Sequence, residues 1–323
     1  MTRNHPTVLA LLLLSLSPCG LRADTAPIAL LPQPVKTEPL PGAFRLSAHT
    51  PVLAPAYLKA EAATLAADLK LTSAELPSGQ APATTGAIRL ELNPELAGLA
   101  PEGYRLKVGG NGIELTANTA AGIFYAGRTL LQLRPTGDPS GFGQIPGIKI
   151  KDAPRFDWRG LMLDCSRTFQ SLDWDEILEG GLAPNATVMS WRGVQDGIAA
   201  AGAGHDVVMS PTSHCYFDYT YQKIDSARVF SFDPVAGMTP DAARHVLGLQ
   251  ANFWSHIDRE SELVDRQLFP RLLALAERGW SPDNRGEWAD YQRRARAQFP
   301  QLERLGVHYQ TADLPVAVPA PAP

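Results

Sequence analysis

The first half of the chain alternates between helical and extended hydrophobic patterns. Residues 88–92 alternate between apolar and polar side chains, and residues 104–108 and 113–117 are two extended runs separated by a Gly-rich turn, which indicates a hairpin. Two helical stripes frame these strands: Leu58, Ala62, Leu65 and Leu69, and later Ile123, Ala126, Leu130 and Leu133. The pattern from about Ile28 to Ile150 therefore predicts a small α+β domain.

The pattern changes after Asp152, where short apolar runs alternate with helical segments. The runs are typical of buried strands in a parallel sheet: 159–164, 187–191, 206–210 and 247–254. Two longer helices are predicted over 260–280 and 287–305. Alternating strands and helices indicate an α/β barrel or a doubly wound sheet. A connector at 135–147, rich in Gly and Pro, marks the boundary between domains at 24–150 and 151–310.

Both ends of the sequence differ from these domains. Arg3, the apolar stretch Val8–Leu16 and the small residue Ala23 match a signal peptide over 1–23, so we expect an exported chain, periplasmic or extracellular, that begins near Asp24. A buried N-terminal helix and a lipid anchor on Cys19 are the alternatives. The Ala/Pro-rich tail at 311–323 is predicted to be disordered.

Composition excludes several classes of protein. The 323 residues are 45% apolar and 19% charged, which indicates a folded protein of about two domains. The net charge is −4 and no basic run occurs, so the sequence carries no electrostatic signature of nucleic acid binding. After the signal segment no apolar stretch is long enough to span a membrane. The oligomeric state is left open.

Cysteines and histidines offer no metal or cofactor site. The sequence after the signal segment contains only Cys165 and Cys215, which either pair or are two small buried side chains. The seven His show no metal-ligand spacing, and neither HExxH nor CxxC occurs. A strand followed by GxGxxG, a P-loop and a GxSxG elbow are also missing. We therefore predict no metal and no cofactor.

Several motifs together resemble one enzyme family. Residues 152–167, Asp-Ala-Pro-Arg-Phe-Asp-Trp-Arg-Gly-Leu-Met-Leu-Asp-Cys-Ser-Arg, are similar to the first strand of the barrel in family 20 glycoside hydrolases, the β-N-acetylhexosaminidases. Further segments follow the same family in its order: 174–177, 189–193, 210–218 and 248–254. Residues 104–133 resemble its small accessory domain. The resemblance implies an α/β fold in which a small N-terminal α+β domain precedes a (β/α)8, TIM-type barrel.

One part of the family pattern is missing. The family carries several strand–helix units, with its catalytic Asp-Glu pair, between the first barrel motif and the Trp-Asp-Glu segment. Here Ser171-Leu172-Asp173 leads directly into Trp174. Only about 155 residues separate Asp152 from Gly306, whereas an eight-unit barrel takes about 250. We therefore predict an incomplete barrel of about five of eight units.

The missing segment removes the catalytic groups that the resemblance implies. In family 20 the substrate's own acetamido oxygen attacks the anomeric carbon, a Glu protonates the leaving oxygen and an Asp orients the acetamido group. We assign no catalytic residue here. Glu176, beside Asp175, is the first substitute to test, although an acidic pair at a helix start is more often stabilised by the helix dipole. Asp164 and Glu179 are expected to be structural.

The substrate-binding residues of the family have counterparts in this chain. The resemblance implies that Arg159 holds sugar hydroxyls and that three Trp rings surround the acetamido methyl and the apolar sugar face. Tyr216 would donate to the acetamido oxygen, Asp218 would accept from a hydroxyl, and His256 stands where the family commonly has a Glu. The predicted set is Arg159, Trp174, Trp191, Tyr216, Asp218, Trp254 and His256.

Three functional hypotheses follow. The first is an exported β-N-acetylhexosaminidase for oligosaccharides, including chitooligosaccharides, that end in N-acetylglucosamine or N-acetylgalactosamine, with activity absent or strongly impaired. The second is a catalytically dead protein that binds N-acetylglucosamine. The third is a remnant that does not fold.

Overall fold

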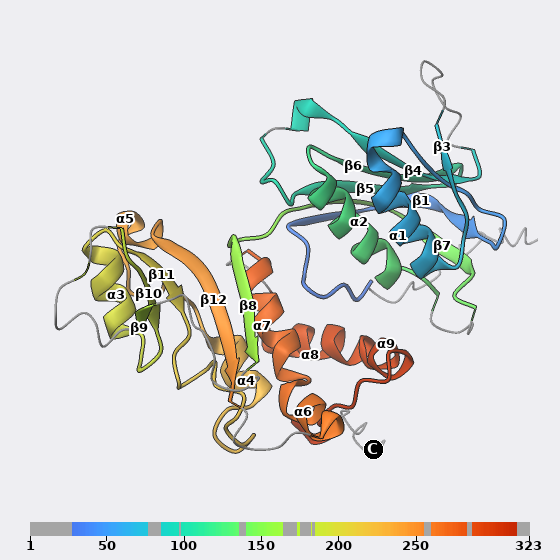
Figure 1. Ribbon diagram of the computed structural model, residues 1–323. Coiled ribbons are helices and arrows are strands. Elements are labelled where there is room, and N and C mark those ends of the chain that lie inside the picture. The colour runs from blue at the N-terminus through green and yellow to red at the C-terminus, as the bar shows by residue number, and fades with distance from the viewer. Residues whose placement is uncertain are drawn as a thin grey trace, which may run out of the picture.

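The computed structural model describes residues 28–76, 85–96, 98–135, 140–163, 173–174, 182, 185–254, 260–282 and 286–314. Within these residues the chain forms two units, each built on its own sheet (Figure 1). The predicted order, an α+β unit followed by a parallel α/β unit, is confirmed.

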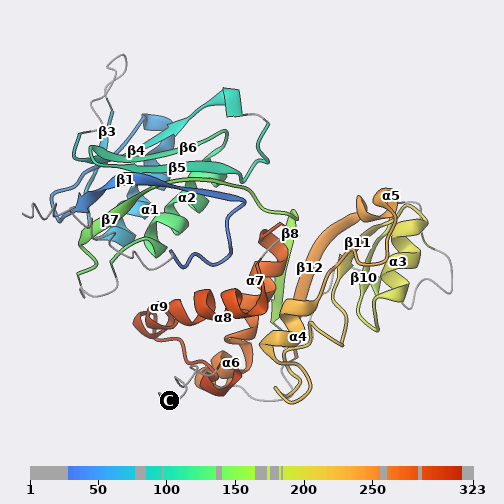
Figure 2. The same cartoon turned by 180° about the vertical axis from the view of Figure 1, so that it is seen from behind.

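The N-terminal unit is a seven-stranded sheet with the order β1-β7-β5-β6-β4-β2-β3. Its strands are β1 (Lys36–Leu46), β2 (Val52–Ala54), β3 (Ser73–Glu75), β4 (Ala87–Leu92), β5 (Tyr104–Gly109), β6 (Gly112–Ala117) and β7 (Gly143–Asp152). Helices α1 (Lys59–Leu69) and α2 (Ala120–Gln132) lie on one side of this sheet (Figures 1 and 2). Their apolar stripes pack on inward strand residues such as Leu106 and Ile113, both fully buried.

Local sequence explains the elements that were predicted best. The extended runs pair as a hairpin from Tyr104↔Ala117 to Gly109↔Gly112, so the Gly-rich turn is only two residues long. Helix α2 starts where Thr119 accepts a hydrogen bond from the backbone N–H of Gly122. Both helical stripes are confirmed as buried faces.

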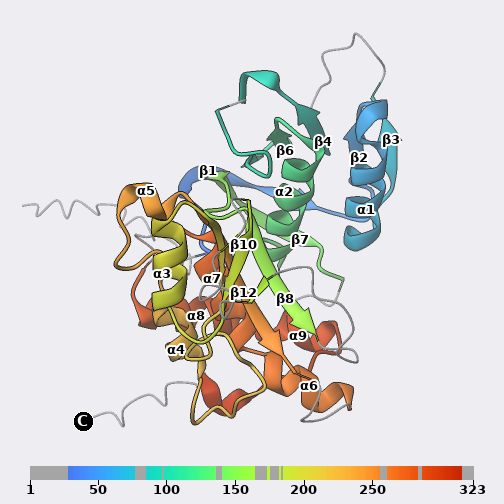
Figure 3. The ribbon, with the colours of Figure 1, turned by 60° about the vertical axis from the view of Figure 1, so that its left-hand side comes forward.

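The second unit is a parallel sheet with the order β8-β12-β11-β10-β9. Its strands are β8 (Trp158–Leu163), β9 (Asp173–Trp174), β10 (Thr187–Ser190), β11 (Asp206–Met209) and β12 (Val246–Phe253). Its helices are α3 (Gln195–Gly202), α4 (Ser226–Ser231), α5 (Pro240–Ala243), α6 (Ser261–Leu268), α7 (Arg271–Trp280), α8 (Trp288–Ala297) and α9 (Phe299–Arg304). Figure 3 shows β8, β12 and β10 running in the same direction.

The first and last strands of this unit are neighbours, as closing a barrel requires. β8 pairs with β12 from Trp158↔Gly248 to Leu163↔Phe253. A Cβ at position 248 would lie 1.8 Å from the carbonyl oxygen of Trp158, and Gly248 has a φ of 155°, so this pairing needs glycine. The described residues contribute five strands to this sheet, in agreement with the incomplete barrel predicted above.

Two predicted helices are each divided in the structure. The segment 260–280 forms α6 and α7 instead of one helix, because Pro270 lacks the N–H that a continuous helix needs. The segment 287–305 forms α8 and α9, and Pro300 lies in the first turn of α9. The second helices of both pairs start beside a proline.

The domain boundary and the C-terminal tail also differ from prediction. Residues 143–147 are not linker, because they begin β7, which continues the N-terminal sheet as far as Asp152. The tail does not start at 311: residues 311–313 form a 3-10 turn, Asp313 accepts a hydrogen bond from the backbone N–H of Ser226, and Leu314 is 1% exposed. The predicted disorder of 315–323 and the predicted signal peptide lie outside the described residues.

Polar contacts tie the two units together. The segment before β1 lies on the helices of the second unit, where Gln33 donates from its backbone to Glu277 at 2.9 Å and Arg294 donates to the carbonyl of Leu30 at 3.1 Å. At the junction, the carboxylate of Asp152 accepts hydrogen bonds from Trp280 of the second unit and from Tyr104 of the first. The N-terminal unit is thus fixed on the amino end of β8.

Candidate functional site

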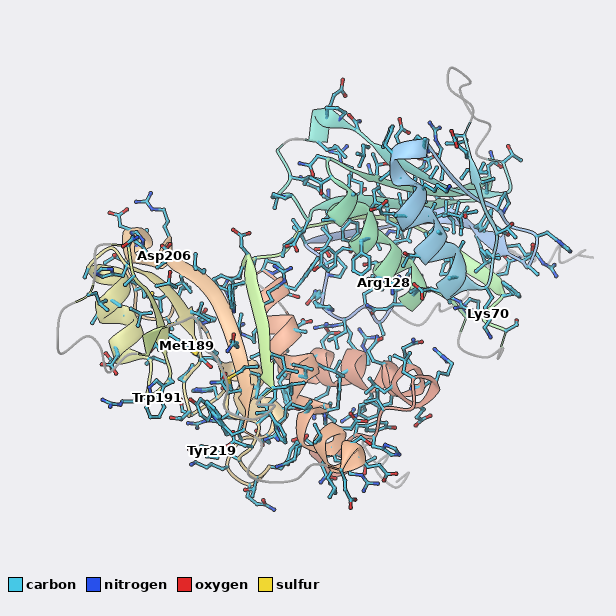
Figure 4. The ribbon with its side chains drawn as sticks, in the orientation of Figure 1. Lys70, Arg128, Met189, Trp191, Asp206 and Tyr219 are labelled. Carbon is cyan, nitrogen blue, oxygen red and sulfur yellow. The ribbon has the colours of Figure 1, made fainter. Side chains whose placement is uncertain are left out.

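The predicted site residues that the structure describes, apart from Arg159, gather at the carboxyl ends of three parallel strands. Trp191 follows β10, Ser210 follows β11 and Trp254 follows β12. Figure 4 shows Trp191 and Tyr219 at this end and Asp206 at the opposite end of the sheet. In α/β barrels this edge carries the ligand-binding groups, because the loops that follow the strands converge there.

Tyr216 is held by the end of β12. The backbone N–H of Asn252 donates to the carbonyl of Cys215, and the carbonyl of Asn252 accepts from Phe217, both at 2.8 Å. This parallel bridge places Tyr216 at the carboxyl end of the sheet, where the side chains of Asn252 and Trp254 favour the ionised form of its hydroxyl and so partly oppose the rise of its pKa. The ring is 5% exposed.

Aromatic rings surround Tyr216. The centroid of its ring lies 6.5 Å from that of Trp191 and 5.9 Å from that of Tyr219. Trp191 and Trp254 are half-buried against the core of the unit. A half-buried ring that packs on the core can also pack on the C–H face of a sugar or on a methyl group. Trp191, Tyr216 and Trp254, predicted as part of one wall, are brought together.

Asp218 contributes the negative charge of the site. It is 4% exposed and lies in the turn that follows Tyr216, which the backbone N–H of Tyr219 closes by donating to the carbonyl of Tyr216 at 3.2 Å. Burial, with a smaller contribution from the charge of Asp218, raises the pKa of Tyr216 to about 12. The Tyr216 hydroxyl therefore keeps its proton at neutral pH and can donate it in a hydrogen bond, while Asp218 offers acceptor oxygens.

A buried polar network behind the aromatic rings was not predicted. Gln250 donates to Asn252 at 3.0 Å, Asn252 donates to Ser210 at 2.9 Å, and Ser210 donates to the carbonyl of Gln250 at 2.8 Å. Polar residues at alternate positions of an otherwise apolar strand, Gln250 and Asn252, point to one face of the sheet, and this spacing could have revealed them. The network fixes Asn252, which in turn holds Tyr216.

Arg159 is the clear correction to the predicted set. It lies near the amino end of β8 and pairs with Leu249 of β12. Asn252, at the site, pairs with Met162, which is three positions further along β8. Its Nη2 donates to both carboxylate oxygens of Glu102, at 2.9 and 2.8 Å, and its guanidinium stacks over Trp280 at 5.0 Å from the ring centroid. Arg159 therefore joins the two units: it lies beside Gly279 of α7, on the helix-covered face of the sheet, whereas the neighbouring Trp158 donates to Gln250 on the other face.

The remaining predicted residues are only partly described. The backbone of Trp174 pairs with that of Met189 in β9, but its side chain lies outside the described part, as do Asp164, Cys165, Glu176, Glu179 and His256. Cys215 is a free thiol in the core, and burial raises its pKa. Cys215 thus matches the alternative of a small buried side chain, and Cys165 lies outside the described residues. Among the described residues no group of three or more His, Cys, Asp or Glu could hold a metal ion.

Family models match both units of the chain. The model "Glycosyl hydrolase family 20, domain 2" matches residues 27–153, and "Glycosyl hydrolase family 20, catalytic domain" matches residues 170–283. The boundary between the two matches falls close to the end of β7 at Asp152.

Curated relatives and solved structures point the same way. The chain is 43% identical over 151 residues to a beta-hexosaminidase of Porphyromonas gingivalis, with 43% of this chain and 19% of the relative covered. It is 41% identical over 154 residues to a beta-hexosaminidase of Vibrio furnissii, with 46% and 23% covered. The aligned part thus spans about a fifth of the length of these relatives.

Among solved structures, the fold matches a family 20 exo-β-N-acetylglucosaminidase from Vibrio harveyi in complex with N-acetylglucosamine, with a TM-score of 0.77, 17% identity, and 88% of this chain and 78% of that chain covered. A β-N-acetylhexosaminidase from Streptomyces coelicolor gives a TM-score of 0.72 at 20% identity, with 90% and 99% covered. These similarities show the fold. Among the described residues, no helix has the length and apolar character to cross a membrane.

Proposed function

Because the chain belongs to family 20 of the glycoside hydrolases, we propose that its barrel unit binds a terminal N-acetylhexosamine and that its hydrolytic activity is absent or strongly impaired. The observation that carries this proposal is the short connection between the edge strands β8 and β9. Nine residues, 164–172, join Leu163 to Asp173.

This connection is too short for the units that would carry the catalytic pair. A crossover between neighbouring parallel strands takes about a dozen residues or more, and each barrel unit also includes a helix. The family pattern places its Asp-Glu pair within such units. A general acid contributes about 10²–10⁴-fold to such reactions, and an orienting Asp adds to this by positioning the acetamido group. The short connection thus supports the loss of both groups.

The binding half of the proposal rests on the aromatic rings and polar groups described above. The half-buried Trp191 and Trp254 offer ring surface, the Tyr216 hydroxyl offers a donor, and Asp218 offers acceptors. Carbohydrate recognition needs this combination of an apolar wall and a few placed polar groups. The polar groups suit an acetamido group, whose carbonyl accepts one hydrogen bond.

The substrate class and the location of the protein belong to the same proposal. The Vibrio harveyi enzyme was solved with N-acetylglucosamine, so we infer N-acetylglucosamine as the first ligand for this chain, with N-acetylgalactosamine as the alternative. Oligosaccharides ending in either sugar, chitooligosaccharides among them, are the proposed partners. The signal-like segment, with Arg3 and Val8–Leu16, supports export.

Isothermal titration calorimetry of the purified chain with N-acetylglucosamine tests the binding half. We expect saturable binding heat, and none with glucose, which lacks the acetamido group. A thermal melt of the same preparation separates a folded chain from the non-folding remnant, because a sharp two-state transition requires a cooperative core. A cooperative melt without binding heat for either N-acetyl sugar would overturn the proposed binding site.

A further inference from the structure

The outer face of the N-terminal sheet, on the side away from α1 and α2, carries an excess of positive charge. Seven cations lie at outward positions of its strands and are here called the basic sheet face: Lys36, Arg45, Arg89, Arg105, Lys107, Lys149 and Lys151. Three carboxylates share the face: Glu38, Glu91 and Glu114. The whole chain has a net charge of −4, so this concentration of cations is local.

Strand register brings like charges directly opposite one another. Lys151 of β7 pairs with Lys36 of β1 on one side and with Arg105 of β5 on the other, which makes a row of three cations. In the next row, Lys149 pairs with Lys107, while Glu38 lies opposite Lys149 and Glu114 lies opposite Lys107 on their other sides. Neighbouring strands are about 4.8 Å apart, and like charges directly opposite each other destabilise a sheet. The row of Lys36, Lys151 and Arg105 therefore does not stabilise the sheet through its own pairing.

The carboxylates on the face do not neutralise it. Glu38 pairs with Lys36 at 2.5 Å, Glu91 with Arg89 at 3.1 Å and Glu114 with Lys107 at 3.4 Å. The side chains of Lys36 and Lys107 remain 64% and 51% exposed. Four cations form no ion pair with any residue that the structure describes: Arg45, Arg105, Lys149 and Lys151.

We propose that the basic sheet face binds an acidic polysaccharide through the carboxylates of its uronic acid units. The cations of the two rows are spread over β1, β7 and β5. Such a spread suits an extended polyanion better than a single small ion. Arg105 adds a planar fork that matches a carboxylate, which the Lys ammonium groups do not. The choice of a polysaccharide as the polyanion rests on the proposed carbohydrate function. The charge pattern is observed independently of that function.

The composition of the face argues against two other polyanions. No aromatic side chain occupies an outward position of β1, β4, β5, β6 or β7, so bases of single-stranded nucleic acid have no ring on which to stack. The same positions lack the large apolar side chains that anchor a protein at a membrane surface. Ionic contacts with an extended glycan need neither feature.

Binding of the full chain to polygalacturonate, measured by calorimetry at low and high salt, tests the proposal. We expect binding that weakens as salt rises, because exposed charges are screened. The triple variant Arg105→Gln/Lys149→Gln/Lys151→Gln should bind about tenfold more weakly, since each exposed ionic contact contributes little alone. The control Lys59→Gln/Arg244→Gln/Arg304→Gln removes three exposed cations elsewhere and should bind like the wild type.

Several outcomes would overturn the inference. The first is wild-type binding to polygalacturonate that does not depend on salt or cannot be detected. The second is an equal loss of affinity in both triple variants. The third is tighter binding to single-stranded DNA or to phosphatidylserine vesicles than to polygalacturonate. Titration of the same preparations with N-acetylglucosamine keeps the two proposals separate. The face variant should keep any wild-type binding of that sugar, and failure of sugar binding with intact polygalacturonate binding would count only against the proposed site in the barrel unit.

Discussion

Leu163 ends one edge strand of the parallel sheet and Asp173 begins the opposite edge strand, although the two residues are only ten positions apart. In a complete barrel, three further strand–helix units would lie between strands at these positions. The matched counterparts of the first and last strands, β8 and β12, are present and paired. The missing strand–helix units therefore fall within the barrel unit, between Leu163 and Asp173, and not at either end of it.

Removal of the Tyr216 hydroxyl should weaken sugar binding. Tyr216→Phe keeps the ring between Trp191 and Tyr219 but removes the donor that we assign to the acetamido oxygen. We expect the affinity for N-acetylglucosamine, measured by calorimetry, to fall by about 1 kcal/mol, roughly fivefold. Tyr309→Phe, which removes a hydroxyl bonded to Glu303, is the matched control. Equal affinity in Tyr216→Phe and the wild type would remove Tyr216 from the site.

Arg159 should act on stability and not on sugar binding. Its guanidinium donates to both oxygens of Glu102 with partial burial on both sides, so Arg159→Ala leaves a carboxylate without its partner. We expect a loss of about 1–3 kcal/mol in the free energy of unfolding by urea. Glu102→Gln should cost a similar amount, and the double variant should show a clear coupling energy. If Arg159→Ala kept the stability of the wild type but lost sugar binding, Arg159 would belong to the sugar-binding site after all.

Asp152 should make stability depend on pH between about 4 and 6. Burial is the main cause that raises the pKa of Asp152 to about 6, although hydrogen bonds from Val35, Trp280 and Tyr104 oppose it. The folded chain thus keeps a proton that the unfolded chain, with a pKa of about 3.9, has already lost. The stabilising contribution of this group is complete below about pH 4 and is lost as the pH rises through 6.

The comparison with Asp152→Asn isolates this effect. From pH 4 to pH 7, the free energy of unfolding of the wild type should fall by about 2–3 kcal/mol relative to that of the variant. Asp206→Asn changes a carboxylate whose side chain is 52% exposed, and serves as the control. Parallel stability curves for the wild type and Asp152→Asn would contradict the assignment.

Short-range patterns predicted the fold well where neighbours in sequence are neighbours in space. The hairpin of β5 and β6 and the stripes of α1 and α2 are examples. The extent of β1 is harder to predict from sequence, because Pro39 and Pro41 interrupt the alternation of apolar and polar residues. Its partner strand β7 also lies about a hundred positions further along the chain. Leu314, in the tail, is buried only because the second unit provides a surface for it.

The candidate site shows the same division. Trp191, Tyr216, Asp218 and Trp254 follow strands that the hydrophobic pattern identifies, so their meeting at one edge could be expected. Arg159 was misplaced because its partner Glu102 lies 57 positions away in the other unit. Asn252 was missed because its role depends on the backbone of residues 215–217, which lie beside it only in the folded chain.

The most direct test of the account is the release of 4-nitrophenol from 4-nitrophenyl N-acetylglucosaminide by the purified chain, with binding of N-acetylglucosamine measured on the same preparation. The account predicts sugar binding without release above a mock preparation from the same host. Release by the chain that disappears in Glu176→Gln would show that a general acid has survived in the shortened barrel, and would contradict the central claim.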